Sequence, residues 1–350
     1  MADMSATGLR RPTAVPGSAD QILSRPDAGA ISAVAALAGP VVVLGAGGKI
    51  GLHLCLMLKA AAQAAGRDLP VYAVSRFTTL RDREAFTAGG VETITADLAV
   101  PAELARLPDA PTVFFLAGVK FGTAASPGLL EAMNVQMPRL VAERYASSQI
   151  VAFSTGCVYP FVDHRVGGAT EDTPPAPVGA YAESCLRREQ AFADVAARMG
   201  TRVVLVRLNY SIEYRYGVLV DIATKVLQQE PIDVSMGYVN VIWQTDAVSH
   251  IIQSARLAAN PPVPINITGA EIYSVRRLAE DFGKVFGLKP VITGEENPTA
   301  WLSDARYSHR IFGRPAHGIG RMIEDIAGWL KAGGETWGKP TGFEKRDGQY

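Results

Sequence analysis

The sequence has few of the residues that disulfide and metal chemistry require. Its 350 residues include only 3 cysteines and 5 histidines. Cys55, Cys157 and Cys185 show no paired spacing, which is typical of a reducing compartment, so we expect a cytoplasmic protein. The histidines lack the spacing of metal ligands, which predicts no metal site. A Gly-x-Ser-x-Gly nucleophile elbow is also missing, so nothing in the sequence supports serine-hydrolase chemistry.

The chain also lacks an excess of charge of either sign, because 34 Lys and Arg balance 34 Asp and Glu. Without a basic surplus we expect neither a nucleic acid nor a membrane as partner. An uncharged stretch from Ile31 to Gly48 approaches the length of a membrane span, but Gly39-Pro40 interrupts it. We interpret this stretch as a helix end, a turn and a strand. It follows prolines and charges, which is not the pattern of a signal peptide.

The sequence does contain a glycine-rich turn between a strand and a helix. Residues 41–44 are apolar and mostly β-branched, which predicts a buried strand. Glycines follow at positions 45, 48 and 51, and a helical pattern begins at Ile50. Such a turn presents free backbone N–H groups and a positive helix end, which together bind phosphate. We expect Gly45 to allow the turn, Gly48 to admit a pyrophosphate and Gly51 to let the helix pack on the strand.

Strand and helix patterns alternate after this turn, which is typical of a doubly wound parallel sheet. Strands are predicted at 41–44, 70–75, 91–95, 112–117, 149–154 and 202–207, and helices at 50–65, 79–88, 101–106, 126–146 and 179–199. Pro138 predicts a kink in the fourth of these helices. After residue 207 the alternation loosens, with helices expected at 217–229, 246–258, 274–286 and 320–332 and a strand near 264–268.

The predicted fold class is therefore α/β, a Rossmann-type sheet with a smaller C-terminal substrate lobe. Residues 1–38 are expected to form an N-terminal extension, disordered up to residue 19 and then folded as one or two short helices broken near Pro26. Residues 39–207 should form the dinucleotide-binding domain. Residues 208–350 should form mainly the substrate lobe, with 241–268 returning to the sheet.

The residues after the second strand indicate which dinucleotide binds. An acidic residue there would accept the ribose 2′-hydroxyl of NAD, but this chain has Ser75-Arg76. A guanidinium suits a 2′-phosphate, because its planar fork makes bidentate bonds. The sequence thus favours NADP over NAD; the alternative is that Arg76 is a solvated arginine beside a strand end. Lys49 in the glycine turn either adds a positive charge near the expected phosphates or is simply exposed.

Further candidate cofactor contacts follow the next two strands. Asp97-Leu98 ends the third strand, where the carboxylate either caps the next helix or bonds the adenine. Ala117 and Gly118 follow the fourth strand, and their small size would let a dinucleotide lie against the backbone.

Together these motifs resemble the extended short-chain dehydrogenase/reductase family, which contains nucleotide-sugar epimerases and dehydratases. The resemblance spans about residues 40 to 330. Its motifs occur in the family's order: the glycine turn, Asp97-Leu98, Phe115-Leu-Ala-Gly118, Asn134-Val135, Ser154-Thr-Gly-Cys-Val-Tyr159, Tyr181-Ala-Glu-Ser-Cys-Leu-Arg-Arg-Glu189, Thr245-Asp-Ala247 and Asn266-Ile267.

The resemblance implies the catalytic groups. Thr155 occupies the position of the family's hydroxyl residue and Tyr181 that of its tyrosine. Lys120 lies in a segment similar to one of UDP-galactose 4-epimerases, where a lysine lies near cofactor and substrate. Asn134, Lys120 and Tyr181 are also implied at the cofactor. The family's lysine, four residues after the tyrosine, is replaced by Cys185.

This replacement changes the expected chemistry, because a free tyrosine has a pKa of about 10 and the family's lysine favours its phenolate. A cysteine with a pKa near 8.5 is mostly neutral and offers no cation. Three explanations stay open. Lys120 or the nicotinamide itself replaces the cation, Tyr181 acts as a neutral acid during reduction, or the protein binds cofactor without turnover.

The substrate is expected to be sugar-like, possibly a nucleotide sugar. Thr155, Tyr159, Asn209 and Tyr210 are the implied substrate contacts, with Asn209 one position earlier than in the family pattern. The dehydratases of the family have an Asp-Glu pair directly after the threonine. This chain has Gly156-Cys157 at those positions, which argues against 4,6-dehydration. The loop 157–178 is a candidate substrate lid.

We therefore predict an NADP-preferring (alternatively NAD-dependent) oxidoreductase or redox epimerase. The alternatives are an NADP-binding regulatory protein that has lost turnover, and a lyase that uses transient oxidation. The resemblance also implies a homodimer through the helices at 126–146 and 179–199.

Overall fold

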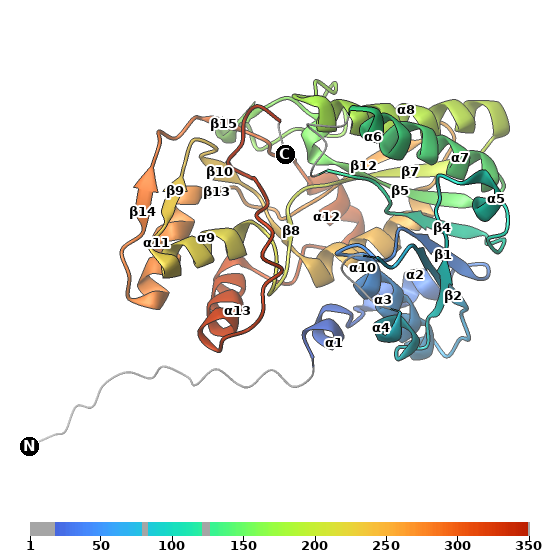
Figure 1. Cartoon of the computed structure of the whole chain (residues 1–350), viewed down its shortest axis with the longest axis horizontal. Helices are drawn as coiled ribbons and strands as arrows, with labels where there is room; N and C mark the ends of the chain where they lie inside the picture. The colour runs from blue at the N-terminus through green and yellow to red at the C-terminus, as the bar shows by residue number, and fades with distance from the viewer. Residues whose placement is uncertain (1–17, 79–82, 121–126, 349–350) are drawn as a thin grey trace, which may run out of the picture.

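Seven parallel strands form the central sheet of the computed structural model, which describes residues 18–78, 83–120 and 127–348 (Figure 1). Their order across the sheet is β12-β7-β5-β4-β1-β2-β3. The strands are β1 (Val41–Leu44), β2 (Val71–Ser75), β3 (Glu92–Thr95), β4 (Thr112–Phe115), β5 (Gln149–Thr155), β7 (Arg202–Leu208) and β12 (Val263–Ile267). The predicted doubly wound α/β sheet is confirmed.

The glycine turn follows the central strand. All four residues of β1 are buried, and β1 pairs with β2 on one side and β4 on the other. The chain therefore reverses its direction of travel across the sheet beside β1. In open parallel sheets the crevice for a ligand lies at this point, outside the carboxyl ends of the strands.

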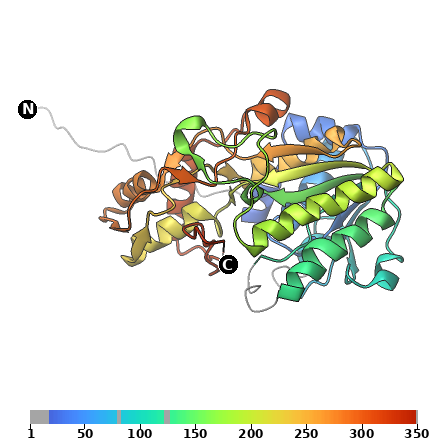
Figure 2. The same ribbon diagram turned by 90° about the horizontal axis from the view of Figure 1, so that it is seen from above.

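Helices cover both faces of the sheet, as Figure 2 shows. One face packs against helices near the start of the chain and after residue 243, namely α2 (Ala28–Ala35), α3 (Gly51–Ala64), α10 (Gln244–Ser254) and α12 (Arg306–Phe312). The other packs against α5 (Pro101–Leu104), α7 (Met137–Arg144) and α8 (Ala180–Met199). Successive residues of β1 alternate between these two cores, as a pleated strand requires.

The helix expected at 126–146 has an irregular middle. It consists of α6 (Pro127–Glu131), a π-helical segment η1 (Ala132–Gln136) and α7. The irregularity predicted at Pro138 thus lies one turn earlier. Because proline has no N–H to donate to the carbonyl four residues back, a wider turn ahead of it is physically reasonable. Asn134 lies in this wider turn.

A second hydrophobic core lies beside the sheet, on the left in Figure 1. It contains α9 (Val218–Gln228), α11 (Val275–Phe286) and α13 (Ile319–Lys331), together with Leu23 and Phe343. Paired short strands connect these helices: β8 (Ser211–Ile212) with β11 (Ile242–Trp243), β9 (Pro231–Asp233) with β14 (Val291–Thr293), β10 (Tyr238–Val239) with β13 (Tyr273–Ser274), and β6 (Val162–Asp163) with β15 (Thr299–Ala300).

Two short helices precede the sheet, α1 (Ala19–Leu23) and α2, and they are interrupted near Pro26 as predicted. The disorder predicted up to residue 19 falls almost entirely outside the described residues. So does the first part of the helix expected at 79–88, of which α4 (Glu84–Thr87) is described. No helix in the described ranges is long and apolar enough to cross a membrane.

Candidate functional site

In the glycine turn, close packing leaves no room for a side chain at Gly45 and Gly51, but it does leave room at Gly48. A Cβ on Gly45, whose φ is +81°, would lie 2.6 Å from the Ala117 nitrogen, and one on Gly51 would lie 2.2 Å from the Ala46 oxygen. At Gly48 the nearest atom would be the Gly45 oxygen, at an ordinary 3.5 Å. Packing therefore leaves space over Gly48, the position where the motif expects a pyrophosphate.

The first turn of α3 begins beside this space. Its N-cap is Ile50, and no side chain caps the helix. The uncapped end of a helix carries a positive partial charge that attracts an anion. The turn therefore fits the pyrophosphate of a dinucleotide, which Gly48, Lys49 and Ile50 would hold through their backbone.

The end of β2 lies against the same turn. A Cβ on Gly47 would meet the Ser75 hydroxyl at 2.6 Å, so Ser75 explains this additional glycine. Arg76 has an exposed side chain, and its Nη1 lies 3.8 Å from Oδ2 of Asp97. Oδ1 of Asp97 accepts a hydrogen bond from the Ala99 backbone N–H at 3.0 Å, which fixes the turn before α5. It does not cap that helix, because the N-cap of α5 is Val100 and no side chain caps it. The neighbouring Leu98 is buried.

A buried polar group joins the end of β4 to α8. Oδ1 of Asn134 accepts from the Val119 N–H at 3.0 Å, and its Nδ2 donates to the Val119 carbonyl at 2.9 Å and to Ser184 Oγ at 2.8 Å. Asn134 thus holds the turn that contains Ala117 and Gly118. Gly118 is required here, because its Cβ would lie 2.2 Å from Arg188 Nη2.

The candidate reacting groups meet where β5 ends and α8 begins. Thr155 ends β5, and its hydroxyl accepts a hydrogen bond from the Cys157 N–H at 3.2 Å. Tyr181 lies in the first turn of α8, and Cys185 follows it one helical turn later. Lys120 faces them from beyond β4, with Nζ 5.7 Å from the centre of the Tyr181 ring.

Burial dominates the electrostatics of this group. It raises the pKa of Tyr181 well above 10, and it also raises the pKa of the Cys185 thiol. Burial lowers the pKa of Lys120. All three shifts favour the uncharged forms, as expected where water is excluded.

Two predicted substrate contacts belong to the protein interior instead. Tyr159 is fully buried, and its hydroxyl donates to Asn266 Oδ1 at 2.9 Å and accepts from Arg207 at 2.8 Å. Asn209 is also buried, and its Nδ2 donates to Asn240 Oδ1 at 2.8 Å. Both the Tyr159 phenol and the Asn209 amide therefore have partners within the protein. Tyr210, with φ of +41°, is only partly buried and keeps its candidate role.

A buried ion pair beneath these residues was not anticipated. Arg207 donates to both carboxylate oxygens of Glu189, at 3.0 and 2.7 Å, and Ser154 donates to the same carboxylate. Glu189 was noted only as a family match. Glu189 lies on α8 and Arg207 lies near the end of β7, the strand that follows this helix. This succession of helix and strand is the signal from which their pairing could have been predicted.

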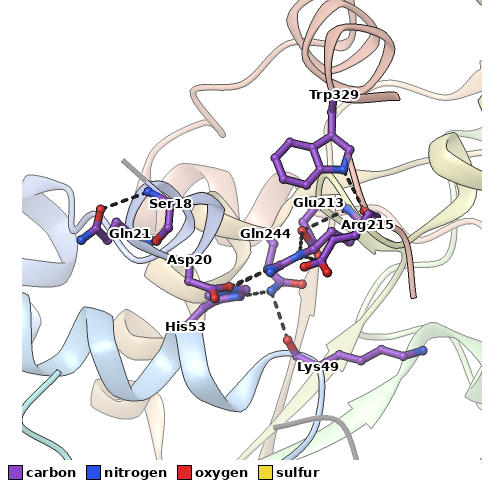
Figure 3. Close-up of polar contacts among 10 residues, drawn as sticks. Ser18, Asp20, Gln21, Lys49, His53, Glu213, Arg215, Gln244 and Trp329 are labelled. Carbon is purple, nitrogen blue, oxygen red and sulfur yellow. Dashed lines mark hydrogen bonds and ion pairs between the residues drawn. The ribbon is translucent and has the colours of Figure 1, made fainter. Parts of the chain in front are cut away.

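A second unanticipated network ties the N-terminal helix to the glycine turn (Figure 3). The fully buried His53 of α3 bonds Asp20 Oδ1 through Nε2 at 2.8 Å, and Arg215 donates to the same oxygen at 2.7 Å. Gln244 bonds the other nitrogen of His53 and donates to the Lys49 carbonyl at 3.4 Å. Helix α1 is therefore connected to the backbone of the turn.

The Lys49 side chain points away from this network in Figure 3. Its Nζ lies 3.2 Å from the centre of the Tyr216 ring. Burial and the neighbouring positive charges of Lys120 and Lys339 lower its pKa to about 7.

A C-terminal strap, residues 334–348, crosses the site. Figure 1 shows it in dark red, running from α13 past β8 toward the C terminus. The Thr341 carbonyl accepts from Lys120 Nζ at 3.4 Å, while the Thr341 N–H and hydroxyl donate to Asp221 at 2.7 and 2.6 Å. Phe343 is buried in the second core. Gly348 packs against Gly179, the N-cap of α8. The strap therefore covers the face on which Lys120 and Tyr181 lie.

The loop predicted as a lid is fixed at its centre. Its strand β6 pairs with β15, and the Ala169 N–H donates to the Leu302 carbonyl at 2.8 Å. Phe161 packs on Trp301, with ring centres 4.6 Å apart. Within the described residues, no group of three or more potential metal-ligand side chains is present.

The sequence and the fold were compared with those of known proteins. The model of the NAD dependent epimerase/dehydratase family matches residues 41–213. No curated protein matches the sequence.

Among solved structures, MoeE5 in complex with UDP-glucuronic acid and NAD is 22% identical with a TM-score of 0.68, and 84% of this chain covers 100% of that one. UDP-glucose 4-epimerase from Thermus thermophilus, in complex with NAD, is 20% identical with a TM-score of 0.68, and 83% of this chain covers 99% of it. DesIV, a dTDP-glucose 4,6-dehydratase from Streptomyces venezuelae with NAD and TYD bound, is 19% identical with a TM-score of 0.70, with coverages of 84% and 97%. At these identities the likeness shows the fold.

Proposed function

Since residues 41–213 belong to the NAD dependent epimerase/dehydratase family, whose members are enzymes of the extended short-chain dehydrogenase/reductase type, we propose that the chain is a nicotinamide-dependent redox epimerase or oxidoreductase of nucleotide sugars. One observation carries this proposal. The open glycine turn follows β1 and Thr155 ends β5, with only β4 between these strands, while Tyr181 lies in the first turn of α8, which packs beside β5. A cofactor held at the turn would therefore extend toward the two hydroxyl groups.

The roles of the residues follow from their chemistry. A bound nicotinamide supplies hydride transfer. Thr155 orients the substrate oxygen at the reacting carbon, and Tyr181 holds or moves the proton of that oxygen. Gly45 and Gly51 shape the turn, and the backbone at Gly48, Lys49 and Ile50 binds the pyrophosphate. Tyr210 is retained as a substrate contact.

We further propose NADP as the preferred cofactor, with NAD as the alternative. The Arg76 guanidinium is exposed at the end of β2, where a 2′-phosphate would lie, and the nearby Asp97 carboxylate already accepts a hydrogen bond from the Ala99 N–H. The solved relatives described above hold NAD, so the preference rests on Arg76 alone. Residues 39–207 with 241–268 would bind the dinucleotide and the remainder mainly the sugar.

The function is tested by assaying the purified protein with NADP or NAD and a panel including UDP-glucose and UDP-glucuronic acid. We expect turnover that Tyr181→Phe lowers at least about a hundredfold while cofactor affinity is nearly unchanged, since the phenol contributes mainly in the transition state. Cofactor binding without turnover of any sugar would instead support the regulatory alternative.

The cofactor preference is tested by titration of Arg76→Asp with each dinucleotide. We expect the variant to lose affinity for NADP by about 3–5 kcal/mol, an order-of-magnitude value from two lost charge-assisted bonds and new repulsion. NAD binding should be spared. An equal loss for both dinucleotides would remove Arg76 from the 2′ position.

A further inference from the structure

Helix α8 places three functional groups on one face. Tyr181, Cys185 and Arg188 are separated by four and then three residues, the spacing that aligns side chains along a helix. The family's lysine would stand at 185. Arg188 is one turn beyond it, and only 6% of its surface is exposed.

The buried guanidinium of Arg188 has polar partners but no counter-charge. Its Nη1 donates to the Phe153 carbonyl at 3.2 Å, and its Nη2 donates to Asn134 Oδ1 at 2.6 Å. Its Nε is buried without a hydrogen-bond partner. In the described part of the chain no carboxylate pairs with it, since the adjacent Glu189 is bound by Arg207.

An unpaired buried charge is costly unless something compensates it. An arginine cannot lose this cost by deprotonation, because its guanidinium keeps its proton in proteins. The chain also uses a glycine at 118, where a Cβ would lie 2.2 Å from Arg188 Nη2. The surroundings of Arg188 therefore leave space for its guanidinium but supply no negative group to it.

We propose that Arg188 provides, one helical turn later, the fixed positive charge that the missing lysine would provide from position 185, and that its counter-charge is the Tyr181 phenolate formed in the reaction. Arg188 acts through Tyr181 and is thus a positioning residue. The inference rests on the proposed function, because it needs Tyr181 as the proton-carrying group.

The other groups that face Tyr181 do not supply this charge equally well. Cys185 and Cys157 are thiols, and a negative charge on either would disfavour the phenolate. Lys120 approaches from beyond β4, but burial lowers its pKa, so it is able to become neutral. Arg188 lies on the same face of α8, and its charge opposes the rise that burial causes in the pKa values of Tyr181 and Cys185.

The direct test measures the phenol without requiring turnover. Tyr181 is replaced by 3,5-difluorotyrosine, whose more acidic phenol titrates in an accessible range, and its fluorine resonance is followed against pH. We expect Arg188→Met to raise the phenol pKa by about one unit, since an opposite charge nearby lowers a pKa by about one to three. Arg188→Lys should retain part of the effect.

A relocation variant separates charge from structure. In Arg188→Met combined with Cys185→Lys, the cation returns to the family's position, and the fluorotyrosine pKa should fall back toward that of the parent. Arg198→Met is the matched control, because Arg198 lies on the same helix with an exposed side chain that pairs with Glu143. It should leave the titration unchanged.

An unchanged phenol pKa in Arg188→Met would overturn the inference and leave the arginine a structural role. If that variant does not fold, Arg188→Gln, which keeps a polar group for Phe153 and Asn134, decides the same question. If the parent enzyme turns over, Arg188→Met should slow sugar oxidation at neutral pH about tenfold per unit of pKa shift and recover at high pH. A parent without turnover refutes the proposed function, whereas the fluorine titration still decides the role of Arg188.

Discussion

Lys49 is the residue whose charge state should respond most to ligand. In the described structure its ammonium lies on the Tyr216 ring, and burial with Lys120 and Lys339 nearby holds its pKa at about 7, while Asp221 opposes the shift. An anion bound at the glycine turn would favour the ammonium and raise this pKa again. Binding and protonation of Lys49 are then thermodynamically coupled.

We predict that dinucleotide binding at pH 8 takes up roughly one proton, because a group with a pKa near 7 is mostly neutral at that pH before the anion arrives. Calorimetry in buffers of different ionisation enthalpy measures this uptake directly. Lys49→Met should abolish it. Lys59→Met, in the helix α3 that follows the turn, is the control and should behave like the parent. Equal uptake in both variants would mean that Lys49 does not face the anion.

His250 provides a pH effect on stability that is independent of catalysis. It is 3% exposed on α10, and burial, aided by His309, lowers its pKa to about 4. In the unfolded chain its pKa would be near 6.5. The unfolded state therefore binds the proton first as the pH falls, so this contribution to stability is complete above pH 6.5 and is lost toward pH 4.

We predict that His250 accounts for about 2 kcal/mol of the loss in unfolding free energy between pH 7.5 and pH 5, an order-of-magnitude value from the pKa difference. Urea unfolding at both pH values measures it. His250→Gln removes the titrating ring and should flatten this part of the profile. A variant with the same pH dependence as the parent would show that the imidazole has the same pKa in the folded and the unfolded state.

At the scale of elements, periodicity was a reliable guide where segments were long. The helix expected at 179–199 is α8 (Ala180–Met199), and the one at 320–332 is α13 (Ile319–Lys331). Strands of two residues, such as β6 and β8, have too few positions to show alternation and were not predicted. The strap was not predicted either, because its residues are held by tertiary contacts and form no regular element.

The strap is held by few but well-placed contacts. Phe343 is buried among the residues of the second core, and Arg346 donates to the Thr299 hydroxyl at 2.9 Å and lies 4.3 Å from the Phe161 ring. Thr341 donates two hydrogen bonds to the partly buried Asp221 carboxylate. Loss of one anchor should therefore release this segment before it unfolds the sheet.

We predict that Phe343→Ala detaches the strap, since removing a buried phenylalanine costs about 3–5 kcal/mol. Hydrogen exchange should become faster across residues 334–348, while the amides of β1, β4 and β5 keep their protection. Lys345→Ala changes an exposed side chain of the same segment and should have no effect. Uniformly faster exchange throughout the protein would contradict local release.

At the scale of the whole molecule, the sequence indicated which elements meet but not how distant residues complete the site. The glycine turn, Thr155 and Tyr181 were predicted because each follows a strand or begins a helix in a recognisable motif. The link from Asp20 to Arg215 joins residues far apart in the chain and has no local pattern. Tyr159 and Asn209 were misjudged for the same reason, because their partners Asn266 and Asn240 come from later elements.

The outer layer formed by α6, α7 and α8 bears on the predicted homodimer. Arg139 pairs with Asp194 at 3.3 Å and Arg198 with Glu143 at 2.8 Å, so ion pairs already link these helices within one chain. Phe192 is not available to a partner, because it is fully buried and packs on Phe115 with ring centres 5.3 Å apart. Four other apolar residues of this layer could contact a partner. They are the exposed Leu129 and the partly buried Met133, Leu140 and Leu186.

We predict that these four side chains form the centre of a dimer interface, surrounded by the ion pairs as a polar rim. Light scattering at micromolar concentration should give about twice the 37.2 kDa chain mass. Leu140→Glu combined with Leu186→Glu should yield a folded monomer, because two carboxylates would have to be buried without partners. Leu227→Glu, on the exposed surface of α9, should remain dimeric. A parent protein of single-chain mass would refute the dimer, and a double variant that stays dimeric would place its interface elsewhere.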